Sequence, residues 1–228
     1  MRFNTRVFNL SKCTAINQNN YLLVPYDNNR VGSPVRPITF LLISVSPGAP
    51  GTQVVATSQR IEIPISYLVA SSYVRNIAAI DDYFLVNLVD AGIYKIKQDG
   101  TFRQVHSGAL ADAFYKWNNT VYAPVEYNRI LTSTDNGDSW QLSTGTPDHF
   151  TLTNYYTVGD SLVGVHFGNL FTLNWNGPRF TSRFLKNDGL ERARITGIET
   201  LRDTVYVATT SGLFARPIKQ FFETKAKL

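Results

Sequence analysis

The sequence has few of the residues on which several function classes depend. It contains one cysteine, Cys13, and three histidines in 228 residues, and only 17% of its residues are charged. A single cysteine excludes an internal disulfide and a zinc site built from several cysteines. The longest apolar runs, such as Ile38 to Val45, are far shorter than the roughly 20 residues of a membrane-spanning helix. No basic residues followed by an apolar stretch open the chain, so we expect no signal peptide in it.

The composition nevertheless supports a folded domain. Hydrophobic residues make up 43% of the chain, which is enough to form a sizeable core and excludes global disorder. All-β domains often reach about 200–250 residues as one unit, so the length is compatible with a single domain.

The net charge of +5 lies at the two ends of the chain. Residues 1–12 carry three basic and no acidic residues, and residues 216–228 also have a net charge of +3. The remaining residues sum to −1. This distribution argues against a continuous basic groove of the kind that follows a nucleic-acid backbone.

A repeat of about 40 residues predicts the architecture. Turn residues precede apolar strands at Phe84, Val121, Leu162 and Val205, which are 37, 41 and 43 residues apart. A second set of apolar positions follows each of these by about nine residues and has nearly the same spacing: Ile93, Ile130, Leu170 and Leu213. Several short strands per repeat of this length are typical of β-propeller blades.

We therefore predict an all-β fold, a β-propeller of four-stranded antiparallel blades with five blades. The alternative is a fragment of a six- or seven-bladed propeller. A single domain would span residues 1–228, with blades at about 10–68, 73–107, 111–145, 152–187 and 194–228. The last blade would end in a fourth strand at Phe221 to Lys225. Residues 1–9 would close the ring by adding a strand to that blade, and their basic side chains would discourage edge-to-edge pairing with other molecules.

One specific motif lies between the third and fourth strands of the third unit. Residues 133–140 read STDNGDSW and match the pattern S-x-D-x-G-x-x-W. Asp135 is suited to accept backbone N–H groups across a turn, and Gly137 to adopt a positive φ. Trp140 would return an aromatic ring to the layer between sheets. We expect a structural role for Ser133, Asp135, Gly137 and Trp140.

This motif resembles the Asp-box, or BNR repeat, of the sialidase-like propeller superfamily, in which the box lies at the same hairpin. The superfamily includes sialidases, other glycosidases, sortilin-type receptors and photosystem assembly factors. The resemblance implies the fold, but it does not imply one activity. Because such proteins are often secreted or surface-exposed, it also implies a secreted, periplasmic or cell-surface location.

Ligand sites in propellers usually gather at one end of the blades, around the central channel. The loops there join the second strand to the third (B–C) and one blade to the next (D–A). Polar residues predicted in the B–C turns are Asp27, Arg30, Asp90, Glu126, Tyr127, Arg129 and His166. Those predicted in the D–A connections are Arg75, Arg192 and Arg194. Taken singly, each is a candidate binding residue that a solvated loop would also explain.

The sequence favours a non-catalytic binding module that recognises a protein or a glycan through the B–C/D–A loop face. The alternative is a sialidase-like glycoside hydrolase that uses carboxylates such as Asp27, Asp90, Glu126 and Asp188, with arginines to bind an acidic sugar. Residues 60–64, RIEIP, match the superfamily's Arg-Ile-Pro motif only superficially. We lean against enzymatic activity and expect no cofactor, no metal site and no nucleic-acid partner. The sequence leaves the oligomeric state open.

Overall fold

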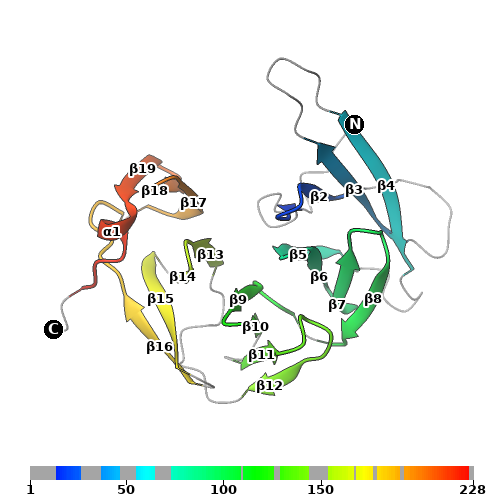
Figure 1. The fold of residues 1–228 in the computed structure, drawn as a ribbon. Coiled ribbons are helices and arrows are strands. Elements are labelled where there is room, and N and C mark those ends of the chain that lie inside the picture. The colour runs from blue at the N-terminus through cyan, green and yellow to red at the C-terminus, as the bar shows by residue number, and fades with distance from the viewer. Residues whose placement is uncertain are drawn as a thin grey trace. The chain divides into compact units, whose positions relative to one another are not determined.

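The computed structural model describes ten stretches of the chain. They are residues 14–26, 37–46, 55–64, 73–108, 110–125, 129–143, 154–166, 168–176, 179–190 and 193–225. The fold is all-β and has five antiparallel sheets, as in a five-bladed β-propeller (Figure 1), so the predicted fold class is confirmed.

Each sheet is a meander in which consecutive strands pair. The first sheet contains β1 (Ala15–Ile16), β2 (Tyr21–Pro25), β3 (Ile38–Ser46) and β4 (Val55–Ile63). The second contains β5 (Val74–Ile80), β6 (Tyr83–Leu88), β7 (Gly92–Lys97) and β8 (Phe102–His106). The third contains β9 (Tyr115–Trp117), β10 (Thr120–Val125), β11 (Arg129–Ser133) and β12 (Gln141–Ser143). The fourth contains β13 (Asn154–Val158), β14 (Ser161–His166), β15 (Asn169–Asn176) and β16 (Arg179–Phe184). The fifth contains β17 (Ile195–Leu201), β18 (Thr204–Thr209) and β19 (Gly212–Pro217).

Tight turns between the first and second strands set the register of these meanders. Asn118 and Asn119 have φ values of 45° and 60° in the two-residue turn between β9 and β10. Positive φ at both central residues defines the turn whose twist matches paired strands, and asparagine tolerates this conformation. The turn signals in the sequence therefore locate the start of the second strand correctly.

The chain divides into two compact units. Unit 1 comprises residues 1–121 and 133–141, and unit 2 comprises residues 122–132 and 142–228. In unit 1 a core of apolar side chains joins the first two sheets and includes Phe40, Ile63, Phe84 and Val86. In unit 2 a second core joins the fourth and fifth sheets and includes Val163, Leu185, Ile198 and Val205. The organisation of residues 1–228 as a single domain, with the blade limits given above, stays a prediction.

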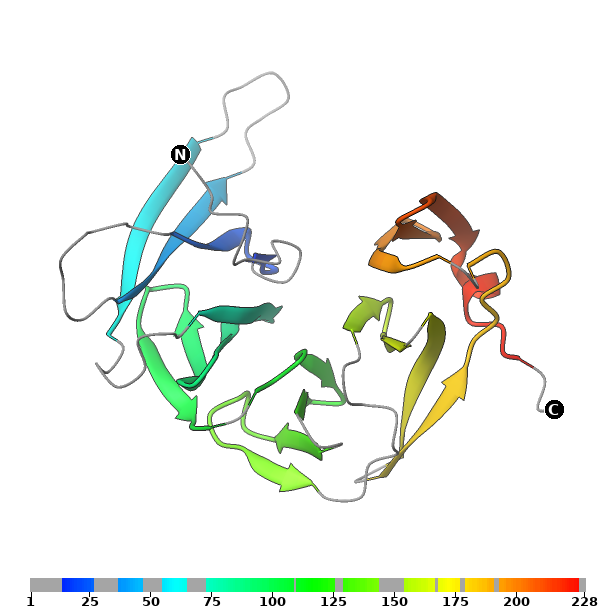
Figure 2. The same cartoon turned by 180° about the vertical axis from the view of Figure 1, so that it is seen from behind.

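The predicted fourth strand of the last blade, Phe221 to Lys225, is wrong. A short helix, α1 (Ile218–Phe221), follows β19 directly, as Figure 2 shows from behind. Pro217 is the last residue of β19; Ile218 N still donates to Asp203 O at 2.8 Å, and the chain then turns into α1. Phe221 is buried in the core of unit 2, and Thr224 forms an isolated bridge with Leu185. Residues 1–9, predicted to close the ring, lie outside the described residues.

Gly164 in β14 lies under a buried aromatic ring, and this close approach generates a test of the core. A Cβ at this position would lie 2.2 Å from Cζ of Phe171, which is fully buried. We expect G164A to lower the free energy of unfolding by about 1–3 kcal/mol through overpacking. Urea denaturation measures the change.

The control is G197A in β17, where a Cβ would meet only the Ala208 side chain at 3.9 Å. That variant should be unchanged or gain up to about 1 kcal/mol, because glycine is unfavourable within a strand. Equal effects of the two substitutions would contradict this packing.

Candidate functional site

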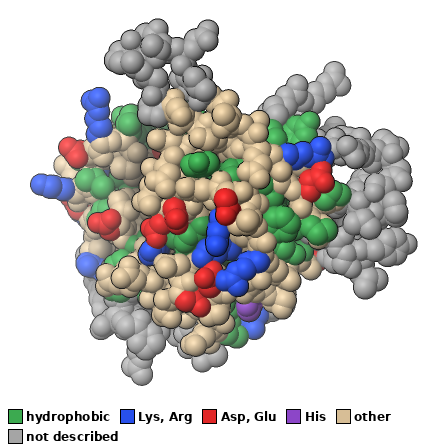
Figure 3. Space-filling view, turned by 45° about the vertical axis from the view of Figure 1, so that its right-hand side comes forward, with side chains coloured by type: hydrophobic (Ala, Val, Ile, Leu, Met, Phe, Trp, Pro, Cys, Tyr) green, Lys and Arg blue, Asp and Glu red, His purple; other side chains and the backbone are tan. Residues whose placement is uncertain are grey.

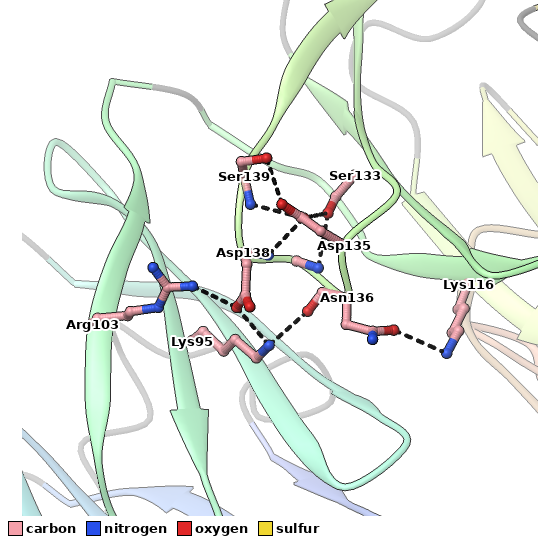
Figure 4. Close-up of polar contacts among 9 residues, drawn as sticks. Lys95, Arg103, Lys116, Ser133, Asp135, Asn136, Asp138 and Ser139 are labelled. Atoms are coloured by element: carbon pink, nitrogen blue, oxygen red, sulfur yellow. Dashed lines mark hydrogen bonds and ion pairs between the residues drawn. The ribbon is translucent and has the colours of Figure 1, made fainter.

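The loop of residues 133–140, between β11 and β12, is organised around one carboxylate (Figure 4). Asp135 Oδ1 accepts hydrogen bonds from Ser133 Oγ at 2.7 Å, Asp138 N at 3.1 Å and Ser139 N at 2.9 Å. Its Oδ2 accepts from Ser139 Oγ at 2.6 Å. Hydrogen bonds from the side chain and backbone of Ser139, and then from Ser133, hold the pKa of Asp135 well below its ordinary value. The carboxylate is thus occupied by donors of its own loop.

Two residues with positive φ bend this loop onto the second sheet. Asn136 has φ 59° and Gly137 has φ 80°. Gly137 N donates to Ser133 Oγ at 2.8 Å, and a Cβ on Gly137 would lie 3.2 Å from Leu85 in β6. The backbone conformation therefore favours glycine here, and the approach to β6 leaves little room for a Cβ.

Lys95 of β7 anchors the loop from the neighbouring sheet. Its side chain is only 8% exposed, and its Nζ donates to Asn136 O at 2.8 Å and to Asp138 Oδ1 at 2.7 Å. The ammonium also lies 4.2 Å from the centre of the Tyr83 ring, a cation–π contact. A buried lysine is costly unless it is paired and hydrogen-bonded, and these three partners meet that requirement.

Arg103 of β8 also forms an ion pair with Asp138, with 2.6 Å between Nη2 and Oδ1. Burial raises the pKa of Asp138, but hydrogen bonds from Lys95 and Arg103 outweigh it and leave this pKa below its ordinary value. On the face drawn in Figure 3, Lys and Arg side chains likewise lie beside Asp and Glu rather than in a patch of one sign.

A second lysine continues the network on the other side of the loop. Lys116 of β9 pairs with Asp81 and lies 3.5 Å from Asn136 Oδ1. Burial, followed by the nearby Asp81 and Asp138 carboxylates, raises the pKa of Tyr83 above its ordinary value. The Tyr83 hydroxyl therefore stays protonated, and it is not poised to act as a phenolate nucleophile.

Trp140, the last residue of the motif, packs beside Phe114 with ring centroids 6.1 Å apart. This aromatic pair places the end of the loop against the segment that enters the third sheet. The assignment of the loop to the Asp-box family stays a prediction.

In unit 1 the structure places two of the candidate binding residues. Asp90 is exposed in the turn between β6 and β7, where the sequence predicted it. Arg75 was predicted in a connection between blades, but it lies within β5 at a register shift between Val74 and Asn76. Its guanidinium forms a 2.5 Å ion pair with Asp112, whose side chain is 12% exposed. Arg75 thus has a carboxylate partner within the fold.

In unit 2 three candidates lie at the expected ends of their strands. Arg129 begins β11, and His166 ends β14 opposite Asn169. Arg194 precedes β17 and is exposed, and its carbonyl accepts a hydrogen bond from Thr210 N at 3.0 Å. The other candidates lie outside the described residues: Asp27, Arg30, Glu126, Tyr127 and Arg192. Because two of the four proposed hydrolase carboxylates are among these, the glycosidase alternative stays untested.

Sequence reasoning missed Lys95, Arg103 and Asp112. The Lys95 position carried a local signal, because it lies between two apolar residues in a strand with few polar positions. Its hydrogen-bond partners, Asn136 and Asp138, are more than 40 residues away in the sequence, and no local pattern identifies them.

Within the described ranges, no group of three or more histidine, cysteine, aspartate or glutamate side chains is arranged to hold a metal ion. The same ranges contain no helix with the length and apolarity needed to cross a membrane.

Comparisons with known proteins support the fold. No protein-family model matches the sequence. No curated protein matches it either. Among solved structures, the chain is similar to YCF48 bound to D1 peptide, with a TM-score of 0.51, 12% identity and coverage of 96% of this chain and 82% of that one. It is also similar to the extracellular domain of the putative one-component system BT4673 from B. thetaiotaomicron, with a TM-score of 0.55 and 13% identity over 99% of this chain. Both neighbours are β-propellers.

A third similar structure is human WBSCR16, with a TM-score of 0.55 and 10% identity over 90% of this chain. The chain spans 62% of the length of WBSCR16 and 31% of that of the BT4673 domain. At these identities the likeness shows the fold alone.

The low pKa of Asp135 gives the loop a pH-dependent contribution to stability. Its pKa is lower in the folded than in the unfolded chain, so the contribution is present above about pH 4, the unfolded pKa. It is lost as the pH falls below that value. We expect D135N to lose about 1 kcal/mol at pH 7, because the carboxylate is exposed to solvent. The deficit should shrink as the pH is lowered toward 3, as measured by urea unfolding across that range.

D82N is the matched control, since it removes one exposed carboxylate from the turn before β6. A D135N deficit that does not change with pH would show that the loop does not depend on the ionised carboxylate.

The Lys95 anchor predicts energetic coupling between two sheets. A double-mutant cycle of K95M and D138N should give a coupling free energy of about 1 kcal/mol, reduced by the 43% exposure of the Asp138 side chain. K97M, at an exposed lysine of the same strand, should show no coupling to D138N. Additive effects of K95M and D138N would contradict the anchoring role.

Proposed function

We propose that the chain is a non-catalytic β-propeller module that binds a protein or a glycan through the loops at the B–C/D–A end of its sheets. The observation that carries the proposal is the placement of Arg129, His166 and Arg194 in unit 2. These side chains come from three sheets, and each lies beside a loop of this type.

The chemistry of these residues suits an acidic ligand. Arginine presents a planar set of donors that matches a carboxylate in a bidentate way, and histidine adds a donor or acceptor near neutral pH. A peptide carboxylate or an acidic sugar would satisfy such a set. Asp135 and Asp138, by contrast, are engaged in the loop between β11 and β12 that contacts the second sheet. The end of the third sheet that carries this loop therefore supports the fold.

The structural neighbours add limited support. One similar propeller, YCF48, has been seen bound to a peptide, and another is an extracellular domain. The proposal extends to a secreted, periplasmic or cell-surface location, in keeping with the second of these. Because the likeness is one of fold, the ligand class rests on the loop residues.

The test uses charge reversal at the proposed face. The immobilised protein is incubated with extracts and a glycan array, and retained species are identified and titrated as purified components. We expect R129E/R194E to weaken binding of the retained partner at least 10-fold, because two guanidinium contacts are replaced by repelling carboxylates.

R202E is the matched control, since Arg202 is exposed in the turn between β17 and β18 at the opposite end of the fifth sheet. It should bind like the unmodified protein, and all variants should keep the same unfolding temperature. Equal binding by R129E/R194E and R202E would overturn the proposal.

A further inference from the structure

Within the part of the chain that the structure describes, the third strand of the fifth sheet has no hydrogen-bonded neighbour on its outer edge. In the other four sheets the third strand lies between two hydrogen-bonded neighbours. Among the described residues β19 pairs only with β18. Its exposure differs accordingly: five of its six residues are exposed, whereas four of the six in the equivalent strand β7 are buried. Leu213 is 68% exposed.

The described residues that follow β19, up to Lys225, do not pair with this edge. After α1, the backbone pairs with the fourth sheet instead: Lys186 N donates to Glu223 O at 2.8 Å, and Lys225 N donates to Phe184 O at 3.1 Å. The ion pair between Lys186 and Glu223 joins the same two segments. The residues that sequence periodicity assigned to the fourth strand are therefore used elsewhere.

The register of β19 identifies the backbone groups that face outward. Thr209 pairs with Gly212 across a two-residue turn, and such a turn closes on a hydrogen-bonded pair. Hydrogen-bonded and non-hydrogen-bonded pairs alternate along an antiparallel ladder, so the N–H and C=O groups of Leu213 and Ala215 point away from β18. Pro217 also falls on an outward position, where its missing N–H costs no bond to β18.

An edge of this kind is a template for another strand, and proteins normally cover or charge it. We propose that the outer edge of β19 is a strand-addition site for an extended acidic peptide from a partner protein. The peptide would pair with Leu213 and Ala215 through its backbone and place apolar side chains beside theirs. This site uses none of the loop side chains of the proposed function.

Charge favours this occupant. Residues 204–222 contain no acidic residue, and they carry Arg216 and Lys219. The Arg216 guanidinium is fixed by the carbonyls of Lys186 and Asp188, at 3.2 and 3.3 Å, so a positive charge is held at one end of the edge. The N-terminal segment of the chain is itself basic, with Arg2 and Arg6 and no acid in residues 1–9, and it is poorly matched to this surface. A carboxylate-bearing strand is complementary to it.

The test measures binding of a fluorescein-labelled peptide, EVTVEVTVE, to the full chain by fluorescence anisotropy. We expect saturable binding that weakens at least 10-fold in A215P, which removes one outward N–H, and several-fold in K219E. R129E/R194E should bind the peptide unchanged, so failure here is distinguishable from failure of the proposed function.

A second measurement leaves the sheet of the protein unchanged. The same peptide with N-methyl groups on alternate residues cannot complete the ladder, and its binding should be lost. No binding of EVTVEVTVE, or equal binding of the N-methylated peptide, would overturn the proposal.

Two further outcomes would identify a different occupant and also overturn it. If a peptide of residues 1–9, or the basic peptide KVTVKVTVK, binds more tightly than EVTVEVTVE, the edge does not select an acidic strand. If the unmodified chain sediments as a dimer and A215P as a monomer, the edge pairs with a second copy of the chain.

Discussion

The structure depends on one constraint: inner strands such as β6, β10 and β14 are buried on both faces, so each face must be covered. β6 shows this most clearly, because all six of its residues are buried. A single four-stranded sheet cannot cover both of its own faces, and stacking of neighbouring sheets is the usual solution. Within each unit the described cores do this, one joining the first two sheets and one joining the last two.

The same constraint explains what could be predicted. Inner strands with two buried faces, such as β6 and β14, begin within one residue of Phe84 and Leu162, the apolar positions that marked the repeat in the sequence. Outer strands carry a weaker pattern because one side meets solvent. Phe221 to Lys225 looked like such a strand, but Phe221 lies in the helix α1 and is buried in the core of unit 2. Phe221 is in a helix because it is buried in a core formed by residues distant in the sequence, and local periodicity does not predict that burial.

The candidate sites divide along a similar line. The loop around Asp135 was predictable because all its internal partners lie within six residues of one another. The Lys95 anchor was not predictable, because the residues to which Lys95 donates hydrogen bonds belong to a loop of another sheet. Arg75 was predicted to be available for a ligand, and its engagement with Asp112 shows how a nearby carboxylate, invisible as a partner in the sequence, changes what a surface arginine can do. The topology of the sheets was enough to predict the strand ends at which Arg129, His166 and Arg194 lie. It does not identify a ligand.

The way the loop holds Asn136 and Gly137 also has a chemical consequence. An asparagine followed by glycine is the dipeptide in which the backbone nitrogen most readily attacks the side-chain amide, releasing ammonia and leaving a cyclic imide that hydrolyses to aspartate or isoaspartate. Here the attacking nitrogen, Gly137 N, donates to Ser133 Oγ and the backbone carbonyl of Asn136 accepts from Lys95, so the folded loop holds the peptide unit that would have to rotate toward the side-chain amide. The folded loop thereby slows deamidation of Asn136, and the rate of that reaction depends on how often the loop opens.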